Sequence, residues 1–156
     1  LYDSLGDEAQ NDRMLLMDVA WAATDVKADG MAGSALLAIR RISERHPGAV
    51  DVLKLSEKAK TVACDLDYPV ACRMGAFQTL ALTGSSDKAA TAEAIEVALD
   101  DNAPATLRMA AMHAASKMAP DDKEFADALR KMASGADTDA RLKTAAAANL
   151  LNMKTR

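Results

Sequence analysis

Three cationic side chains recur at equal intervals in the second half of the chain. Each follows an acidic or amide residue by six positions, in the pairs Asp67 and Arg73, Asn102 and Arg108, and Asp137 and Lys143. Such a row could bind an anionic ligand, because guanidinium groups hold carboxylate or phosphate oxygens with two N–H groups. It could instead form a polar spine that satisfies turn backbone groups and neighbouring carboxylates. We favour the structural interpretation and expect the middle pair, which contains Asn102, to be the weakest ionically.

A second set of side chains adjoins these cations and could bind a protein. It combines thioethers, one aromatic ring and two polar groups: Met74, Phe77, Gln78, Met109, Met112 and His113. Each of the first three stands 35 residues before its counterpart among the last three. Methionine-rich grooves adapt to an amphipathic partner helix. The alternative is that these side chains pack against neighbouring helices.

Patterns typical of catalysis and metal binding are missing from the sequence. The two histidines, His46 and His113, are 67 residues apart, and neither a G-x-S-x-G elbow nor a glycine-rich phosphate loop occurs. Cys64 and Cys72 lack the C-x-x-C spacing of a zinc site, so we expect them to pack as small apolar groups. We therefore predict no catalytic residue, no cofactor and no metal.

The candidate residues fall at fixed places in a repeat of 35 residues that starts at Asp51. Each copy opens with a helix-capping residue, Asp51, Ser86 or Asp121, and continues with apolar residues at the i, i+3, i+4 spacing of a helix. A polar break and a second apolar stripe follow. We predict first helices over residues 51–64, 86–99 and 121–134, and second helices over 69–83, 104–118 and 138–153.

The first fifty residues are less regular and lack the acidic and cationic columns. Apolar spacing predicts helices over residues 8–24 and 33–46, a degenerate pair that caps the repeats 51–85, 86–120 and 121–156. We expect Met14, Met17 and Trp21 to fill the N-terminal core. A basic cluster near the end of the second helix complements the helix dipole or, alternatively, meets an anionic partner; it consists of Arg40, Arg41, Arg45 and His46.

Composition supports one all-α domain spanning residues 1–156. Alanine, the best helix former, supplies 35 of 156 residues, and aromatic residues only 3%. The net charge of −4 disfavours nucleic acid as a partner, and no apolar run approaches the roughly 20 residues of a membrane span, so we expect no membrane insertion. The chain starts at Leu1, which fits a processed chain or a domain of a longer protein. No compartment is indicated.

Two stretches, from Asp67 to Ala76 and from Asn102 to Ala111, carry an Asp or Asn in a turn, an Arg six residues later, and then Ala. They resemble the HEAT repeat, above all its short bacterial and phycobilisome-lyase-like versions, and Asp137 to Lys143 is a weaker third copy. The resemblance covers about residues 51–153. It implies a right-handed α-solenoid of about four antiparallel helix pairs, an α-α superhelix whose second helices line a concave face. It also implies that the acidic and cationic columns form a ladder.

We expect a non-catalytic protein–protein interaction or assembly module, a scaffold within a larger complex. Its partner is another protein, contacted through the Met74 to His113 set. The resemblance implies one alternative, a lyase-like or accessory factor for chromophore attachment. A HEAT-like nucleic-acid repair protein is disfavoured by the acidic isoelectric point of about 5.2.

Overall fold

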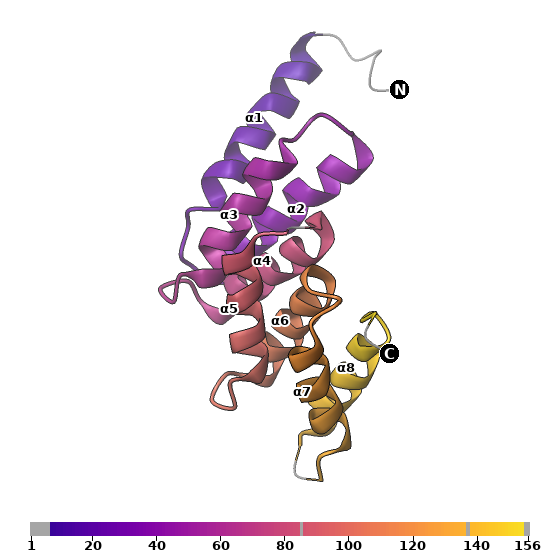
Figure 1. Ribbon diagram of the computed structural model, residues 1–156. Helices are drawn as coiled ribbons and strands as arrows, with labels where there is room; N and C mark the ends of the chain where they lie inside the picture. Colours follow the sequence, from indigo (N-terminus) through magenta and orange to yellow (C-terminus); the bar gives the residue numbers. More distant parts are fainter. Residues whose placement is uncertain (1–6, 85, 137, 155–156) are drawn as a thin grey trace.

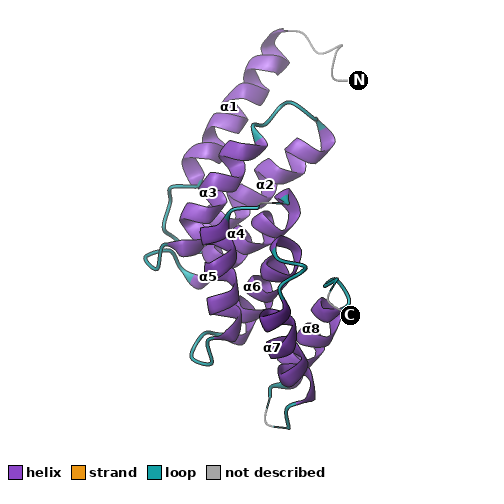
Figure 2. Ribbon diagram, in the orientation of Figure 1, coloured by secondary structure: helices purple, strands orange, loops and turns teal. Residues whose placement is uncertain are grey.

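The structure is a computed structural model that describes residues 7–84, 86–136 and 138–154 (Figure 1). These residues form eight helices joined by turns. They are α1 (Asp7–Ala23), α2 (Met31–Arg45), α3 (Val52–Cys64), α4 (Val70–Thr83), α5 (Lys88–Leu99), α6 (Ala105–Met118), α7 (Lys123–Ser134) and α8 (Ala140–Leu150). Within these ranges there is no strand (Figure 2). The predicted all-helical class is confirmed, and the largest difference in bounds is at α8, which ends at residue 150 rather than 153.

Aspartates cap the first turns of α3, α5 and α7. Asp51 accepts hydrogen bonds from the N–H groups of Leu53 and Lys54, Asp87 accepts from Ala90, and Asp122 accepts from Phe125. A carboxylate at this position satisfies backbone donors that have no partner within the helix. In the second and third repeats the cap lies one residue after the predicted Ser86 and Asp121.

Packing follows chain order. Each odd-numbered helix contacts the even-numbered helix that follows it, and α2, α4, α6 and α8 contact one another in succession. α4 and α6 are therefore covered by three helices each, and each contains eight buried residues, against three in α8. In Figure 1, α1 and α8 lie toward opposite ends of this row.

α2 and α4 cross at two glycines. A Cβ atom on Gly75 would lie 2.5 Å from the Cα atom of Gly33, and a Cβ atom on Gly33 would lie 2.9 Å from the carbonyl oxygen of Cys72. Side chains at these two positions would force the helices apart, so glycine sets their close approach. Ala110, which stands 35 residues after Gly75, is buried in α6.

Candidate protein-interaction surfaces

Four residues of the predicted contact set are partly exposed and two are buried. Met74 and Gln78 on α4, and their counterparts Met109 and His113 on α6, are partly exposed. Phe77 and Met112 are completely buried, so their assignment as surface contacts was wrong. Because three helices cover α4 and α6, only a narrow strip of each stays open, and the i, i+4 pairs occupy that strip. We call these four residues the even-helix strip.

His113 takes part in a polar cluster that joins α6 to α8. Its Nδ1 atom lies 3.3 Å from Asn149 Oδ1, and Ser116 Oγ lies 2.9 Å from the same oxygen. Asn149 Nδ2 donates to the carbonyl oxygen of Ala145 at 2.9 Å. The Ser116 hydroxyl faces amide and carbonyl oxygens rather than the imidazole ring, so the cluster does not form the hydrogen bond between nucleophile and base that covalent catalysis requires.

Arg73 and Arg108 make the same backbone contact one repeat apart. Arg73 Nε donates to the carbonyl oxygen of Ala63 at 2.8 Å, and Arg108 Nε donates to that of Ala98 at 3.2 Å. Both side chains are buried, and both acceptors belong to the last turn of the preceding helix, where carbonyl groups lack helical partners. These contacts support the structural interpretation of the cationic column.

The carboxylates paired with the two arginines differ from those expected. Arg73 contacts Glu93 on α5 at 3.1 Å, whereas Asp67 pairs with Lys27 at 3.2 Å; the expected pair of Asp67 with Arg73 does not form. Arg108 contacts Asp101 at 2.9 Å, not Asn102. Asp67 and Asn102 thus have other partners, Lys27 and Asp100, in place of the arginines.

Those other carboxylates are Asp65 and Asp100, which stand 35 residues apart. Asp65 Oδ1 accepts the N–H of Asp67, and Asp100 Oδ1 accepts the N–H of Asn102, each at 2.9 Å. Asn102 Nδ2 also donates to Asp100 at 3.2 Å, so its amide serves its own turn. The acid that repeats in the turns thus lies two residues before the predicted column.

The third pair of the row does not repeat these contacts. Lys143 Nζ donates to the carbonyl oxygen of Ala136 at 3.3 Å. This acceptor lies seven residues earlier in the sequence, whereas the acceptors of the two arginines lie ten residues earlier. Lysine has one donor nitrogen, Nζ, in place of the separate Nε and Nη groups with which the arginines contact a carbonyl and a carboxylate. Asp137, its predicted partner, lies outside the described residues.

The basic cluster on α2 does not form one open face. Arg40 pairs with Glu44 at 3.3 Å, and its side chain is 15% exposed. Arg41 and Arg45 are exposed. Because the Arg40 guanidinium is largely covered, we favour the interpretation that the cluster complements the dipole at the end of α2 over a site for an anionic partner.

Four large apolar side chains of α1 are open to solvent. Their exposed fractions are 62% for Met14, 63% for Leu15, 68% for Leu16 and 57% for Val19. We call these residues the α1 apolar surface. The expectation that Met14 fills the core was wrong, although Met17 and Trp21 do pack against it. Consecutive apolar residues at 14–17 surround the helix, so a single neighbour, α2, cannot cover them all.

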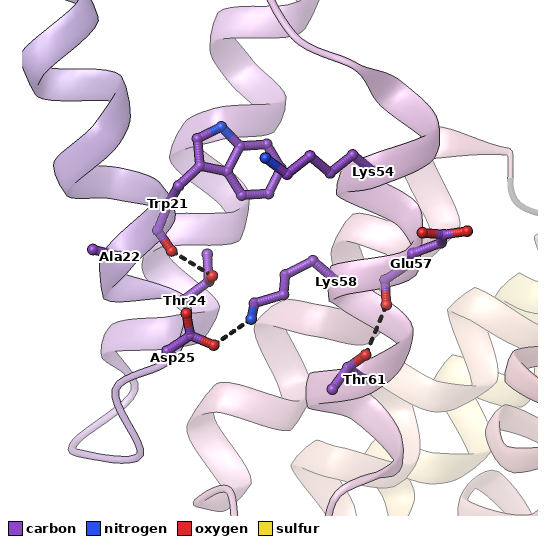
Figure 3. A pocket seen from close by; sticks show the side chains of 8 residues that line it. All are labelled: Trp21, Ala22, Thr24, Asp25, Lys54, Glu57, Lys58 and Thr61. Atoms are coloured by element: carbon purple, nitrogen blue, oxygen red, sulfur yellow. Dashed lines mark hydrogen bonds and ion pairs between the residues drawn. The ribbon is translucent and has the colours of Figure 1, made fainter.

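A hollow of about 420 Å³ separates α1 from α3 (Figure 3). The Lys54 ammonium lies 4.7 Å from the centre of the Trp21 ring, and Lys58 pairs with Asp25. The hollow therefore contains two ammonium groups that already have partners, and Glu57 also lines it. Trp21 is thus the residue of α1 with a described polar contact to α3, while Asp25 belongs to the turn that follows α1.

The described residues offer little to a metal or a reactive thiol. Among them no group of three or more His, Cys, Asp or Glu side chains could hold a metal ion. Cys72 is buried, and burial raises the pKa of the partly covered Cys64 thiol, which makes it a poorer nucleophile at neutral pH. None of the helices in these ranges has both the length and the apolar character needed to span a membrane.

Comparisons with known proteins return no match: no family model, no curated protein and no solved structure is detectably similar to this chain.

Proposed function

We propose that this chain is a non-catalytic protein-interaction or assembly module, built as a right-handed HEAT-like α-solenoid of about four antiparallel helix pairs. Two features support this proposal. The even-numbered helices contact one another in chain order, and the Arg73 and Arg108 contacts recur at the 35-residue spacing. Arrays of this kind act through the surfaces that they present rather than through a single reactive centre.

The observation that carries the functional proposal is the α1 apolar surface. Contiguous apolar patches are rare on proteins that act alone and mark sites of contact with other molecules. Met14, Leu15 and Leu16 are adjacent in sequence and point to different sides of α1, whereas Leu15 and Val19 lie one turn apart on the same side. Covering them would remove four large side chains from water, which is a substantial driving force for association.

The charge of α1 indicates the chemistry of its partner. In the sequence, residues 7–23 include one basic residue, Arg13, against four acidic ones: Asp7, Glu8, Asp12 and Asp18. Complementary charge steers association and selects among apolar partners. We therefore propose a partner segment that is helical, apolar along one side and flanked by lysine or arginine.

The even-helix strip is a second contact surface for the same function. Met74, Gln78, Met109 and His113 are only partly exposed, so they offer less apolar area than α1 does. A longer partner could contact both surfaces, and variants can separate their contributions.

Affinity capture with matched variants tests the proposal. Leu15→Glu combined with Val19→Glu places charge on the α1 apolar surface. Leu66→Glu, at a side chain that is 77% exposed in the α3–α4 turn, is the control. Met74→Ala with Met109→Ala tests the even-helix strip. Circular dichroism should show that each variant keeps its helices.

We expect the wild type and the Leu66→Glu variant to capture a basic partner from the native source. The α1 variant should fail to capture it. Equal capture by all variants would reject the α1 surface. Concentration-dependent dimers that disappear in the α1 variant would show that the partner is a second copy, against the proposal of a basic one.

A further inference from the structure

Arg108 differs from Arg73 in the source of its counterion. Arg73 pairs with Glu93, which belongs to the next repeat and whose side chain is only 25% exposed. The residue 35 positions after Glu93 is Ala128, which has no carboxylate. Arg108 instead pairs with Asp101 of its own repeat, whose side chain is 93% exposed. A buried cation is therefore neutralised by a group that lies almost entirely in water.

Arg108 also borders a hollow of about 510 Å³ between the α5–α6 turn and the α7–α8 pair. The Arg108 side chain is 9% exposed and fixed by its bond to Ala98, so its position does not depend on Asp101. Lys131 on α7 adds a second cation, and Met132 and Leu142 supply apolar wall. Asp139 also lines the hollow, but its carboxylate is engaged by Arg141 at 3.2 Å.

We propose that this hollow is a binding site for one oxyanion, a carboxylate or a phosphate, held by Arg108 and Lys131. The ligand takes the place of Asp101 on the Arg108 guanidinium. That exchange costs little, because an exposed carboxylate loses a weak surface ion pair and remains hydrated. The ligand gains a guanidinium that is already fixed and largely desolvated, which strengthens a charge-assisted hydrogen bond.

The preceding repeat provides an internal comparison. There the carboxylate of Glu93 already engages Arg73, and Leu66 stands 35 residues before Asp101. Arg73 should therefore be closed to added anions while Arg108 is open. The site does not depend on the proposed function, since it is lined by the α5–α6 turn and by α6 to α8, and the α1 apolar surface lies toward the other end of the helix row (Figure 1).

Nuclear magnetic resonance of the arginine Hε–Nε groups of the full chain tests the site. Inorganic phosphate and a short glutamate-containing peptide are titrated separately at constant ionic strength. We expect a saturable shift at Arg108 and none at Arg73. Tighter binding of the peptide would identify an acidic protein segment as the source of the oxyanion. Tighter binding of phosphate would identify a phosphoryl group as its source.

Variants at exposed residues keep the test independent of folding. Asp101→Asn removes the competing carboxylate and should lower the Kd by about two- to fivefold, the factor that an exposed ion pair supplies. Lys131→Gln should weaken binding, and Lys117→Gln, the matched control at an exposed lysine of α6 that does not line the hollow, should leave it unchanged. Absence of a saturable Arg108 response, or an Asp101→Asn variant that binds no tighter, would overturn the proposal. The Leu15→Glu, Val19→Glu variant should bind the anion normally, which separates failure of this site from failure of the interaction surface.

Discussion

Arg73 ties three helices together through one side chain. Its Nε group satisfies a carbonyl at the end of α3, its guanidinium pairs with Glu93 on α5, and its own backbone belongs to α4. A buried guanidinium is costly unless its donors are paired, and here both described contacts are short enough to be good hydrogen bonds. The residue therefore couples neighbouring repeats as well as capping one helix.

Replacement of Arg73 by Gln should lower the free energy of unfolding by about 2–4 kcal/mol, because it leaves the Ala63 carbonyl and the Glu93 carboxylate without their partner. Arg141→Gln, which breaks an exposed pair with Asp139, should change it far less, because both partners of that pair lie in water. Urea unfolding followed by circular dichroism measures both. A similar loss in the two variants would contradict the coupling role of Arg73.

Asp87 should make stability depend on pH at the α3–α5 contact. The Ala90 N–H group and then the Lys60 ammonium lower the pKa of this carboxyl below its ordinary value of about 4. Its ionised form therefore stabilises the folded chain above that ordinary value, and the contribution is lost as pH falls through the lowered pKa.

We accordingly expect Asp87→Asn to be less stable than the wild type at pH 7, with the difference shrinking below about pH 4. Unfolding by urea from pH 2 to 7 provides the measurement. A difference that is the same at every pH would show that the charge of Asp87 contributes nothing.

At the scale of elements, the crossing of α2 and α4 depends on two glycines. Gly75→Ala adds a Cβ atom 2.5 Å from Gly33 Cα, so the helices must separate. We expect a loss of about 1–3 kcal/mol in the free energy of unfolding from this overpacking, although alanine is favoured over glycine in an isolated helix by about 1 kcal/mol. Ala92→Ser, at an exposed site on α5, is the control, and thermal unfolding distinguishes the two. A stabilised Gly75→Ala variant would refute the close crossing.

The helices themselves could be predicted well from sequence, because alanine content, capping aspartates and apolar spacing all agree. Pro69 and Pro104 stand immediately before α4 and α6, near the first turn, where a missing N–H group costs nothing. The register of the turns was harder to predict. The side chains of Asp65 and Asp67 are equally suited to accept a backbone N–H group in the turn. The backbone geometry gives this role to Asp65, which accepts the N–H group of Asp67.

The candidate surface was harder to predict than the helices for a related reason. Periodicity identifies apolar residues but not how many neighbours a helix has. Phe77 and Met112 are buried because α4 and α6 have neighbours on three sides, while Met14 and Leu15 are exposed because α1 contacts chiefly α2. The uninterrupted apolar run at residues 14–17 was the available signal, since one neighbouring helix cannot cover every side.

At the scale of the whole molecule, burial is concentrated in the middle of the helix row. α4 and α6 have eight buried residues each and α8 has three, so local opening should cost most in the middle and least at the end. We expect native-state hydrogen exchange to be slowest in α4 and α6 and faster in α8, as nearest-neighbour coupling predicts. Uniform protection across the described helices would indicate one cooperative unit instead.

The most direct measurement is hydrogen exchange of the chain with and without its captured basic partner, resolved by peptide. We predict slower exchange in the peptides that contain Met14, Leu15, Leu16 and Val19, with little change in α8. Unchanged exchange across residues 14–19, with protection gained only elsewhere, would contradict the assignment of α1 as the interaction surface.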